Sequence, residues 1–220
     1  MRTIVLATQK GGSGKSTLAI GLAVAALDTG QRVGIIDADP QGTISNWSRR
    51  RQNSAPRVIR AGSAAAIDHA ILDLQRTAVT VVIIDTPATD NALSATGIAA
   101  ADLCLIPARP SPADIEAAVP TLGALRRLDK RFAFVLAQTP ARSSRTSEAA
   151  SALHAAGVLA LPYIVQRNDH QDALGVGLGV TEYDPHGKAA EEIRGLWRWV
   201  WTSLTRESID HGPTAIKAAG

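Results

Sequence analysis

The 220-residue sequence has one cysteine, Cys104, few aromatic side chains and no long apolar run. One cysteine excludes an intrachain disulfide and a thiolate-built metal site within one chain. It lies in the apolar run 103–106, which favours a buried strand position. The longest apolar segment, 18–27, is too short to span a bilayer. The first residues lack the charged region and apolar core of a signal peptide, so we expect a cytoplasmic protein.

The remaining composition is that of a folded globular protein. Hydrophobic residues make up 45% and charged residues 20%, values without the bias of disordered chains. We expect one domain over residues 1–205 and a flexible tail over 206–220, where the sequence is rich in alanine and glycine. The net charge of +3 leaves a mildly basic surface, which permits nucleic acid or an anionic membrane as partner and establishes neither.

Apolar runs of strand type alternate with helical patterns along the chain. Strands are predicted over residues 2–8, 33–36, 58–60, 79–84, 103–107, 132–137 and 159–165. Helices are predicted over residues 15–29, 45–51, 64–74, 92–101, 112–128, 147–156 and 187–204. This alternation predicts a single-domain α/β fold, with a mostly parallel twisted sheet and helices on both faces.

A glycine-rich loop follows the first predicted strand and precedes the first predicted helix. Its nucleotide-binding candidates are Lys10, Gly11, Gly12, Ser13, Gly14, Lys15, Ser16 and Thr17. Glycines let the backbone N–H groups surround an anion, and the helix adds the positive end of its dipole. Lys15 suits the β- and γ-phosphates, and the Ser16 hydroxyl suits Mg²⁺. Gln9 stands where the ordinary motif has glycine, and a second lysine, Lys10, precedes the glycine pair.

Three aspartates fall at the carboxyl ends of predicted strands, where open α/β sheets bind ligands. Asp85 follows four consecutive β-branched residues, and Asp37 and Asp39 share one side of an extended segment. With Ser16, these carboxylates are the candidate Mg²⁺ ligands or holders of its waters. Asp37 is expected to support the metal shell, with capping of the next helix as a fair competitor.

The loop resembles the deviant Walker A motif of the ParA/MinD family of ATPases. The segment Asp37-Ala-Asp39-Pro-Gln41, with further segments at 102–114 and 179–193, extends the resemblance over nearly the whole chain. It implies ATP and Mg²⁺ as ligands, and an ATPase that forms a sandwich dimer when ATP is bound. Lys10 would then touch the partner's nucleotide, and Asp39 would orient the attacking water, so Lys10, Lys15 and Asp39 are the catalytic candidates.

The resemblance gives two further residues an expected role. Gln138 follows the strand over 132–137, where many relatives carry an asparagine that contacts adenine; an exposed loop glutamine is the alternative. Ser111, Pro112 and Asp114 fit a helix start, with Ser111 as N-cap and Asp114 closing a capping box. A role for Asp114 at the dimer surface is the less favoured interpretation.

Basic residues gather in the second half of the chain. The candidates for DNA contact are Arg126, Arg127, Lys130, Arg131, Arg142 and Arg145. Such a run is either a solvated helix end or a surface for phosphate backbones. The resemblance favours non-specific DNA, hence a nucleoid-associated bacterial protein with a ParB-like or adaptor partner that stimulates hydrolysis.

Two alternatives to the partition-type ATPase remain. A MinD-like protein would lie on a membrane through its last helix, where residues 193–204 carry an apolar stripe with tryptophans. Docking of that stripe on the sheet explains it better. A P-loop metabolic enzyme such as dethiobiotin synthetase would leave Lys10 and the Asp37–Gln41 motif without a purpose.

Overall fold

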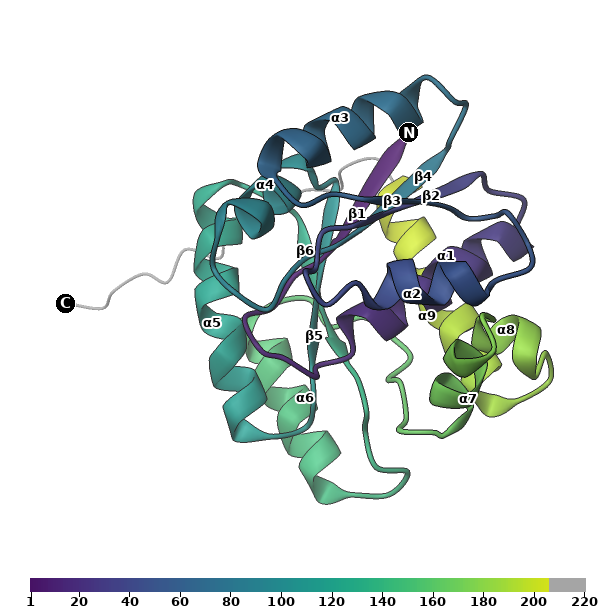
Figure 1. The fold of residues 1–220 in the computed structure, drawn as a ribbon. Helices are drawn as coiled ribbons and strands as arrows, with labels where there is room; N and C mark the ends of the chain where they lie inside the picture. Colours follow the sequence, from purple (N-terminus) through teal and green to yellow (C-terminus); the bar gives the residue numbers. More distant parts are fainter. Residues whose placement is uncertain (206–220) are drawn as a thin grey trace.

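The computed structural model describes residues 1–205, which form a six-stranded sheet covered by helices (Figure 1). Every strand pair is parallel, and the strand order is β3-β2-β4-β1-β5-β6. The strands are β1 (Arg2–Leu6), β2 (Val33–Asp37), β3 (Arg57–Arg60), β4 (Val81–Asp85), β5 (Leu103–Ala108) and β6 (Phe132–Leu136). The predicted tail over 206–220 lies outside the described residues.

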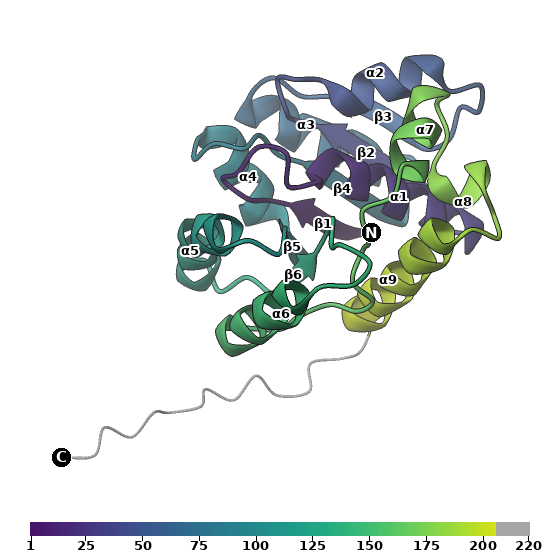
Figure 2. The same cartoon turned by 90° about the horizontal axis from the view of Figure 1, so that it is seen from below.

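Helices cover both faces of the sheet (Figure 2). One face carries α1 (Lys15–Asp28), α2 (Thr43–Arg50), α7 (Asp169–Gly175), α8 (Val180–Tyr183) and α9 (Lys188–Thr205). The other face carries α3 (Ala64–Gln75), α4 (Ala92–Ala100), α5 (Pro112–Arg127) and α6 (Ser144–Ala156). The predicted fold class is therefore confirmed.

The strands explain the two layers, because successive side chains point to opposite faces. In β1, Ile4 and Leu6 join one core and Val5 joins the other, and all three are fully buried. Such strands read as continuous apolar runs, which is why the sequence located the central strands. Cys104 is likewise a fully buried β5 residue, as predicted, and burial raises the pKa of its thiol to about 12.

The last helix, α9, packs on the sheet through the predicted stripe. Ile193, Leu196, Trp197 and Val200 are at most 2% exposed and belong to the same core as α1. Trp197 also donates a hydrogen bond from Nε1 to the Thr29 hydroxyl, 3.0 Å away. The apolar face is thus occupied within the chain, which confirms core docking.

The predicted seventh strand, over residues 159–165, is not present. That segment makes only isolated parallel bridges to the chain at Phe134 and Thr139. Pro162 lies in its middle and has no N–H to donate to a ladder, which interrupts the pairing with β6. The sequence also missed α7 and α8, which follow this segment. Most other predicted elements are present, with ends shifted by a few residues.

The start of α5 differs in one detail from its prediction. Ser111 is the N-cap, and its Oγ accepts from the Asp114 backbone N–H at 3.2 Å. Asp114 does not close a capping box, because the Ser111 backbone N–H donates to the Arg109 carbonyl instead. The Asp114 carboxylate accepts from the Ser111 hydroxyl and the Arg109 side chain. It therefore belongs to an ion-pair cluster described below.

Candidate nucleotide-binding site

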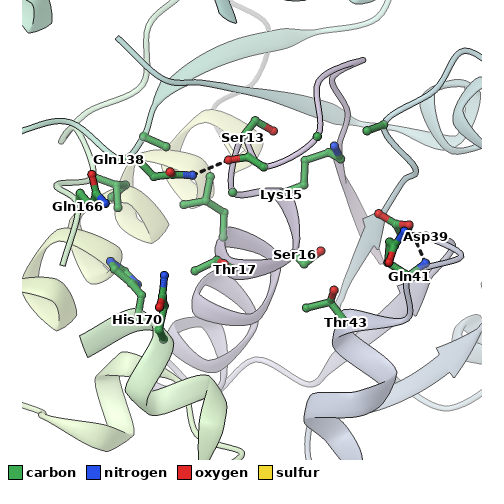
Figure 3. Close-up of a pocket in the computed structure, with 18 of the residues that line it drawn as sticks. Ser13, Lys15, Ser16, Thr17, Asp39, Gln41, Thr43, Gln138, Gln166 and His170 are labelled. Carbon is green, nitrogen blue, oxygen red and sulfur yellow. Dashed lines mark hydrogen bonds between the residues drawn. The ribbon is translucent and has the colours of Figure 1, made fainter. Parts of the chain in front are cut away.

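A cleft of about 640 Å³ lies at the carboxyl ends of the central strands (Figure 3). It is bordered by the glycine-rich loop, by the loop after β2, and by residues 137–138 and 164–171. Its volume is within the range of small-ligand pockets. Of the predicted nucleotide-binding residues, those lining it are Gly11, Gly12, Ser13, Gly14, Lys15, Ser16, Thr17 and Gln138.

The loop has the backbone shape that its glycines predict. Gly12 and Gly14 adopt left-handed φ angles of 73° and 95°, which L residues with a Cβ rarely take. Gly14 is also the N-cap of α1, so the loop passes directly into the helix. The positive end of the α1 dipole therefore faces the cleft, an arrangement that favours a phosphate group.

Lys15 is folded into the loop and is only 6% exposed. Its Nζ donates to the carbonyls of Thr8 and Lys10, each 3.3 Å away. Burial lowers the pKa of Lys15, while the negative charges of Asp85 and Asp39 oppose that shift. An ammonium held here in low dielectric by two neutral carbonyls is a strong attractor for the phosphate charge.

Ser16 and Asp85 form the second element of the site. The Ser16 hydroxyl donates to Asp85 Oδ2 at 2.6 Å, and the other carboxylate oxygen is buried without a partner. Burial raises the pKa of Asp85 to about 7; the Ser16 hydrogen bond lowers it, and Asp37 raises it. Carboxylates that lack a compensating cation behave in this way.

The unpaired Oδ1 of Asp85 is an oxygen that a Mg²⁺ ion bound beside Ser16 would compensate. Among the described residues, no three His, Cys, Asp or Glu side chains lie close enough to hold a metal alone. Mg²⁺ does not require such a cage, because it is usually held by one or two carboxylates, waters and the substrate's phosphates. Ser16 and Asp85 fit that pattern, and the cation would neutralise phosphate charge there.

The other two aspartates have separate surroundings. Asp37 pairs in register with Asp85 on the adjacent strand, and its Oδ2 accepts from the Ser45 N–H at 2.8 Å and its hydroxyl at 2.5 Å. It thus binds the first turn of α2, which the capping interpretation anticipated, and its Oδ1 is buried without a partner. Asp39 lines the cleft, and its Oδ1 accepts only from the Gln41 N–H. Of the two, Asp39 alone borders space that a ligand could occupy.

Lys10 behaves differently from the rest of the loop, because its side chain is not part of the cleft wall. Its Nζ lies 3.2 Å from Asp114 Oδ2, and the Asp114 side chain is 1% exposed. Arg109 Nε lies 3.0 Å from the other oxygen. Burial alone would raise the pKa of Asp114, but hydrogen bonds from Arg109, Ser111 and Lys10 lower it overall. The two lysines of the loop therefore serve different groups.

Gln138 contacts the glycine-rich loop directly. Its Nε2 donates to the Gly12 carbonyl at 2.8 Å, as the dashed line in Figure 3 shows. Its backbone is left-handed, with φ 52°, a conformation uncommon for glutamine. It is therefore placed at the cleft rather than in a distant exposed loop.

The wall formed by residues 164–171 was missed by the sequence analysis. It includes Gln166, Arg167, His170 and Gln171. His170 is 9% exposed, and its Nε2 is buried without a partner. Burial lowers the pKa of His170, although the nearby Glu192 and Asp169 oppose that shift. The only signal in the sequence was the polar run after residues 159–165, and such a run by itself indicates a loop.

The predicted DNA-contacting residues are split between opposite ends of the sheet. Residues 126–131 precede β6, whereas Arg142 and Arg145 follow it on the same side as the cleft. Three of the first group bond to backbone carbonyls of the chain: Arg126 to Ala156, Lys130 to Ala101 and Arg131 to Ser203. The structure thus does not bring the six residues together.

A parallel sheet with a glycine-rich loop after its central β1, and a Ser–Asp pair beside the loop, defines a P-loop nucleotide-binding protein. The family model described as CobQ/CobB/MinD/ParA nucleotide binding domain matches residues 4–180. The chain belongs to that family.

Relatives of the chain include proteins named for carboxysome distribution and for chromosome partitioning. The chain is 30% identical over 206 residues to "Maintenance of carboxysome distribution protein A" of Halothiobacillus neapolitanus, covering 88% of this chain and 94% of the relative. It is 39% identical over 74 residues to the chromosome partitioning protein ParA of Caulobacter vibrioides, covering 32% and 28%.

Solved structures share the fold at low sequence identity. The Cyanothece McdA(D38A)–ATP complex has a TM-score of 0.74 at 20% identity, covering 91% of this chain and 96% of that one. MinD of Pyrococcus furiosus has a TM-score of 0.76 at 18% identity, covering 92% and 99%. At this identity the match supports the fold alone.

Proposed function

We propose that this protein is an ATPase that dimerises face to face around ATP, holds DNA without reading its sequence, and so positions a cargo on the bacterial nucleoid. Hydrolysis, accelerated by a cargo-bound partner protein, ends the DNA-bound state. The relatives named for carboxysome distribution and chromosome partitioning support a positioning role. A protein organelle, a chromosome or a plasmid all fit as cargo.

The observation that carries this proposal is the position of Lys10. Lys15 already occupies the phosphate-binding loop, and Lys10 instead lies against Asp114 with its side chain 29% exposed. A lysine next to a triphosphate cradle, but directed away from it, has its target on another molecule. In a face-to-face dimer that target is the partner's nucleotide, where the ammonium stabilises charge as an arginine finger does.

The exchange of partners by Lys10 has a low energetic cost. When Lys10 leaves, Asp114 retains hydrogen bonds from Arg109 and Ser111, so its buried carboxylate still has donors that compensate its charge. The Lys10 side chain is itself 29% exposed, so water already solvates part of its charge. The attraction between the Lys10 ammonium and the partner's triphosphate, which carries several negative charges, then offsets the loss of the Asp114 contact.

The loop after β2 supplies the residue that acts in hydrolysis. Asp39 lines the cleft and accepts only one backbone hydrogen bond, so it can accept another from the attacking water. Among the described residues, the cleft lining contains no carboxylate besides Asp39, and its one imidazole, His170, lies on the wall formed by residues 164–171. Slow hydrolysis by such a sparse site suits a switch whose turnover depends on a partner.

The membrane alternative finds no support in α9, since its apolar stripe is buried. No helix within residues 1–205 is long and apolar enough to cross a bilayer. The metabolic alternative shares the fold: cobyrinic acid a,c-diamide synthase of Mycobacterium smegmatis has a TM-score of 0.73 at 17% identity. That likeness is to the fold alone, and it leaves Lys10 without a target.

The test is the Lys10→Ala variant, with Lys188→Ala as the matched control. Lys188 is exposed at the start of α9, away from the cleft. We expect both variants to bind a fluorescent ATP analogue like wild type. Gel filtration with non-hydrolysable ATP should show dimers of wild type and Lys188→Ala, and monomers of Lys10→Ala. Steady-state hydrolysis should fall only in Lys10→Ala.

Two results would count against the dimer mechanism. Normal dimerisation and turnover of Lys10→Ala would make the lysine a surface residue of the loop. Loss of ATP binding in Lys10→Ala would instead assign it to its own subunit's nucleotide.

A further inference from the structure

An arginine-rich surface lies beside the cleft, on α2 and β3. The sequence from residue 40 to residue 67 contains five arginines and neither aspartate nor glutamate. The arginines are Arg49, Arg50, Arg51, Arg57 and Arg60. A stretch of 28 residues with charge of only one sign is unusual in a chain whose total charge is nearly balanced.

Two of the five are explained by the fold. Arg51 is 2% exposed and makes a bidentate pair with Glu182, at 2.6 and 2.7 Å, while its guanidinium lies over Trp47. Arg57 pairs with Asp73 on α3. These two arginines connect neighbouring elements of the fold.

The other three have no carboxylate partner within residues 1–205. Arg49 bonds to the Asn46 side chain, Arg50 to the Leu174 carbonyl and Arg60 to the Pro40 carbonyl. All three are exposed. The acids on the helix packed against α2 are Asp169 and Asp172 of α7, and neither pairs with them. Their full positive charge is therefore available to a ligand.

The surface around them has the composition of a phosphate-binding face. The exposed residues of α2 and the following turn are Thr43, Asn46, Arg49, Arg50, Gln52 and Asn53. Neutral amides, hydroxyls and guanidinium groups are the side chains that contact nucleic-acid backbones. Arg60 lies at the Gly42 end of α2 and Arg49 with Arg50 at the other, about 12 Å apart by helical rise. Duplex DNA carries several charges over that length.

The helix that presents these residues is rigid and connected to the nucleotide site. Ile44 and Trp47 on its inner side are fully buried, and Trp47 Nε1 donates to the Leu178 carbonyl at 3.1 Å. At its first turn Thr43 lines the cleft, and Ser45 is bonded to Asp37. A change of the Asp37 neighbourhood by Mg²⁺ and ATP would therefore act on this helix first.

We propose that the outward face of α2, together with Arg60, contacts the phosphate backbone of double-stranded DNA. This inference rests on the proposed function and assigns its DNA contact to a surface outside the predicted basic residues. Arg126 and Arg127, two of the DNA-contacting residues predicted from the sequence, lie at the end of the sheet opposite the cleft. Their neighbours there are the exposed Leu128 and Asp129, and Lys130 and Arg131 donate to carbonyls of the chain. Contact at α2 also explains how ATP could control DNA binding.

The experiment compares two matched double variants, Arg49→Gln/Arg50→Gln and Arg126→Gln/Arg127→Gln. Each removes two exposed arginines from the last turn of a helix, so charge and helix-dipole effects are equal. Fluorescence anisotropy with a random-sequence duplex, with non-hydrolysable ATP and at several salt concentrations, gives the affinity and its salt slope. Nucleotide affinity and dimerisation are measured on the same samples.

We expect the α2 variant to lose affinity on the order of tens-fold at 0.1 M salt, and its log–log salt slope to become less steep by about 2 for each subunit in contact. The α5 variant should bind like wild type. The proposal is overturned if the α5 variant is the weaker binder, or if both lose affinity equally, which would indicate net charge alone. Failure of wild type to bind DNA while it dimerises and hydrolyses ATP would overturn it and remove DNA from the proposed function, with the ATPase assignment intact.

Discussion

Asp85 should reduce the stability of the nucleotide-free protein, and Asp85→Asn should reveal by how much. The carboxylate is completely buried, it receives one hydrogen bond from Ser16, and its second oxygen has no partner. Its pKa is raised from 3.8 to about 7. This rise of the pKa corresponds to a ceiling of about 4 kcal/mol on the free energy of unfolding.

The sign follows from proton linkage. An acid whose pKa is higher in the folded state binds a proton more readily when folded, so stability falls as pH rises. The loss begins near the unfolded pKa, proceeds at up to about 1.4 kcal/mol per pH unit, and ends near pH 7. Asparagine does not titrate, so the Asp85→Asn variant should escape this loss.

The assay is urea unfolding of wild type and Asp85→Asn, without nucleotide, between pH 5 and pH 8. The difference in unfolding free energy should shift in favour of the variant by about 1.5–3 kcal/mol over that range. Taking the change with pH removes any constant cost of burying the amide. Saturating Mg²⁺ and ATP should stabilise wild type far more than the variant, because the cation favours the ionised carboxylate.

Two outcomes would refute this reasoning. A difference that is constant between pH 5 and 8 would mean that Asp85 titrates outside this range. A shift in favour of wild type as pH rises would mean that a cation or a further donor already compensates the carboxylate in the absence of nucleotide.

Three further predictions follow from the site and its supports. Lys15→Ala should abolish binding of a fluorescent ATP analogue, since the loop loses its ammonium; ordinary affinity would remove this loop from the site. Asp39→Ala should bind ATP and dimerise but hydrolyse slowly in single-turnover assays, because its carboxylate acts on the water; undiminished turnover would direct attention to Asp37. Glu182→Gln should lower the free energy of unfolding by about 2 kcal/mol in urea titrations, because Arg51 stays buried with a weaker partner. An unchanged midpoint would show that the Ala55 and Gly177 carbonyls compensate the Arg51 charge without Glu182.

The local parts of the molecule were predictable from the sequence. The phosphate-binding residues are contiguous, so one strand, one turn and one helix place them without help from the rest of the chain. Asp37 and Asp85 were located because buried parallel strands are continuous apolar runs whose carboxyl ends are easily recognised. The same reasoning identified the alternating architecture and the buried stripe of α9.

What only the tertiary structure decided involves residues far apart in the chain. His170 reaches the cleft because residues 158–166 run beside β6, and no periodic pattern encodes that course. Lys10 and Asp114 meet because β1 and β5 are neighbours in the sheet. The sequence joined residues 126–131 with Arg142 and Arg145 as one basic group, but β6 runs between them. Because β6 runs from one end of the sheet to the other, basic residues that lie close in the sequence on either side of it are separated in space by the length of the strand.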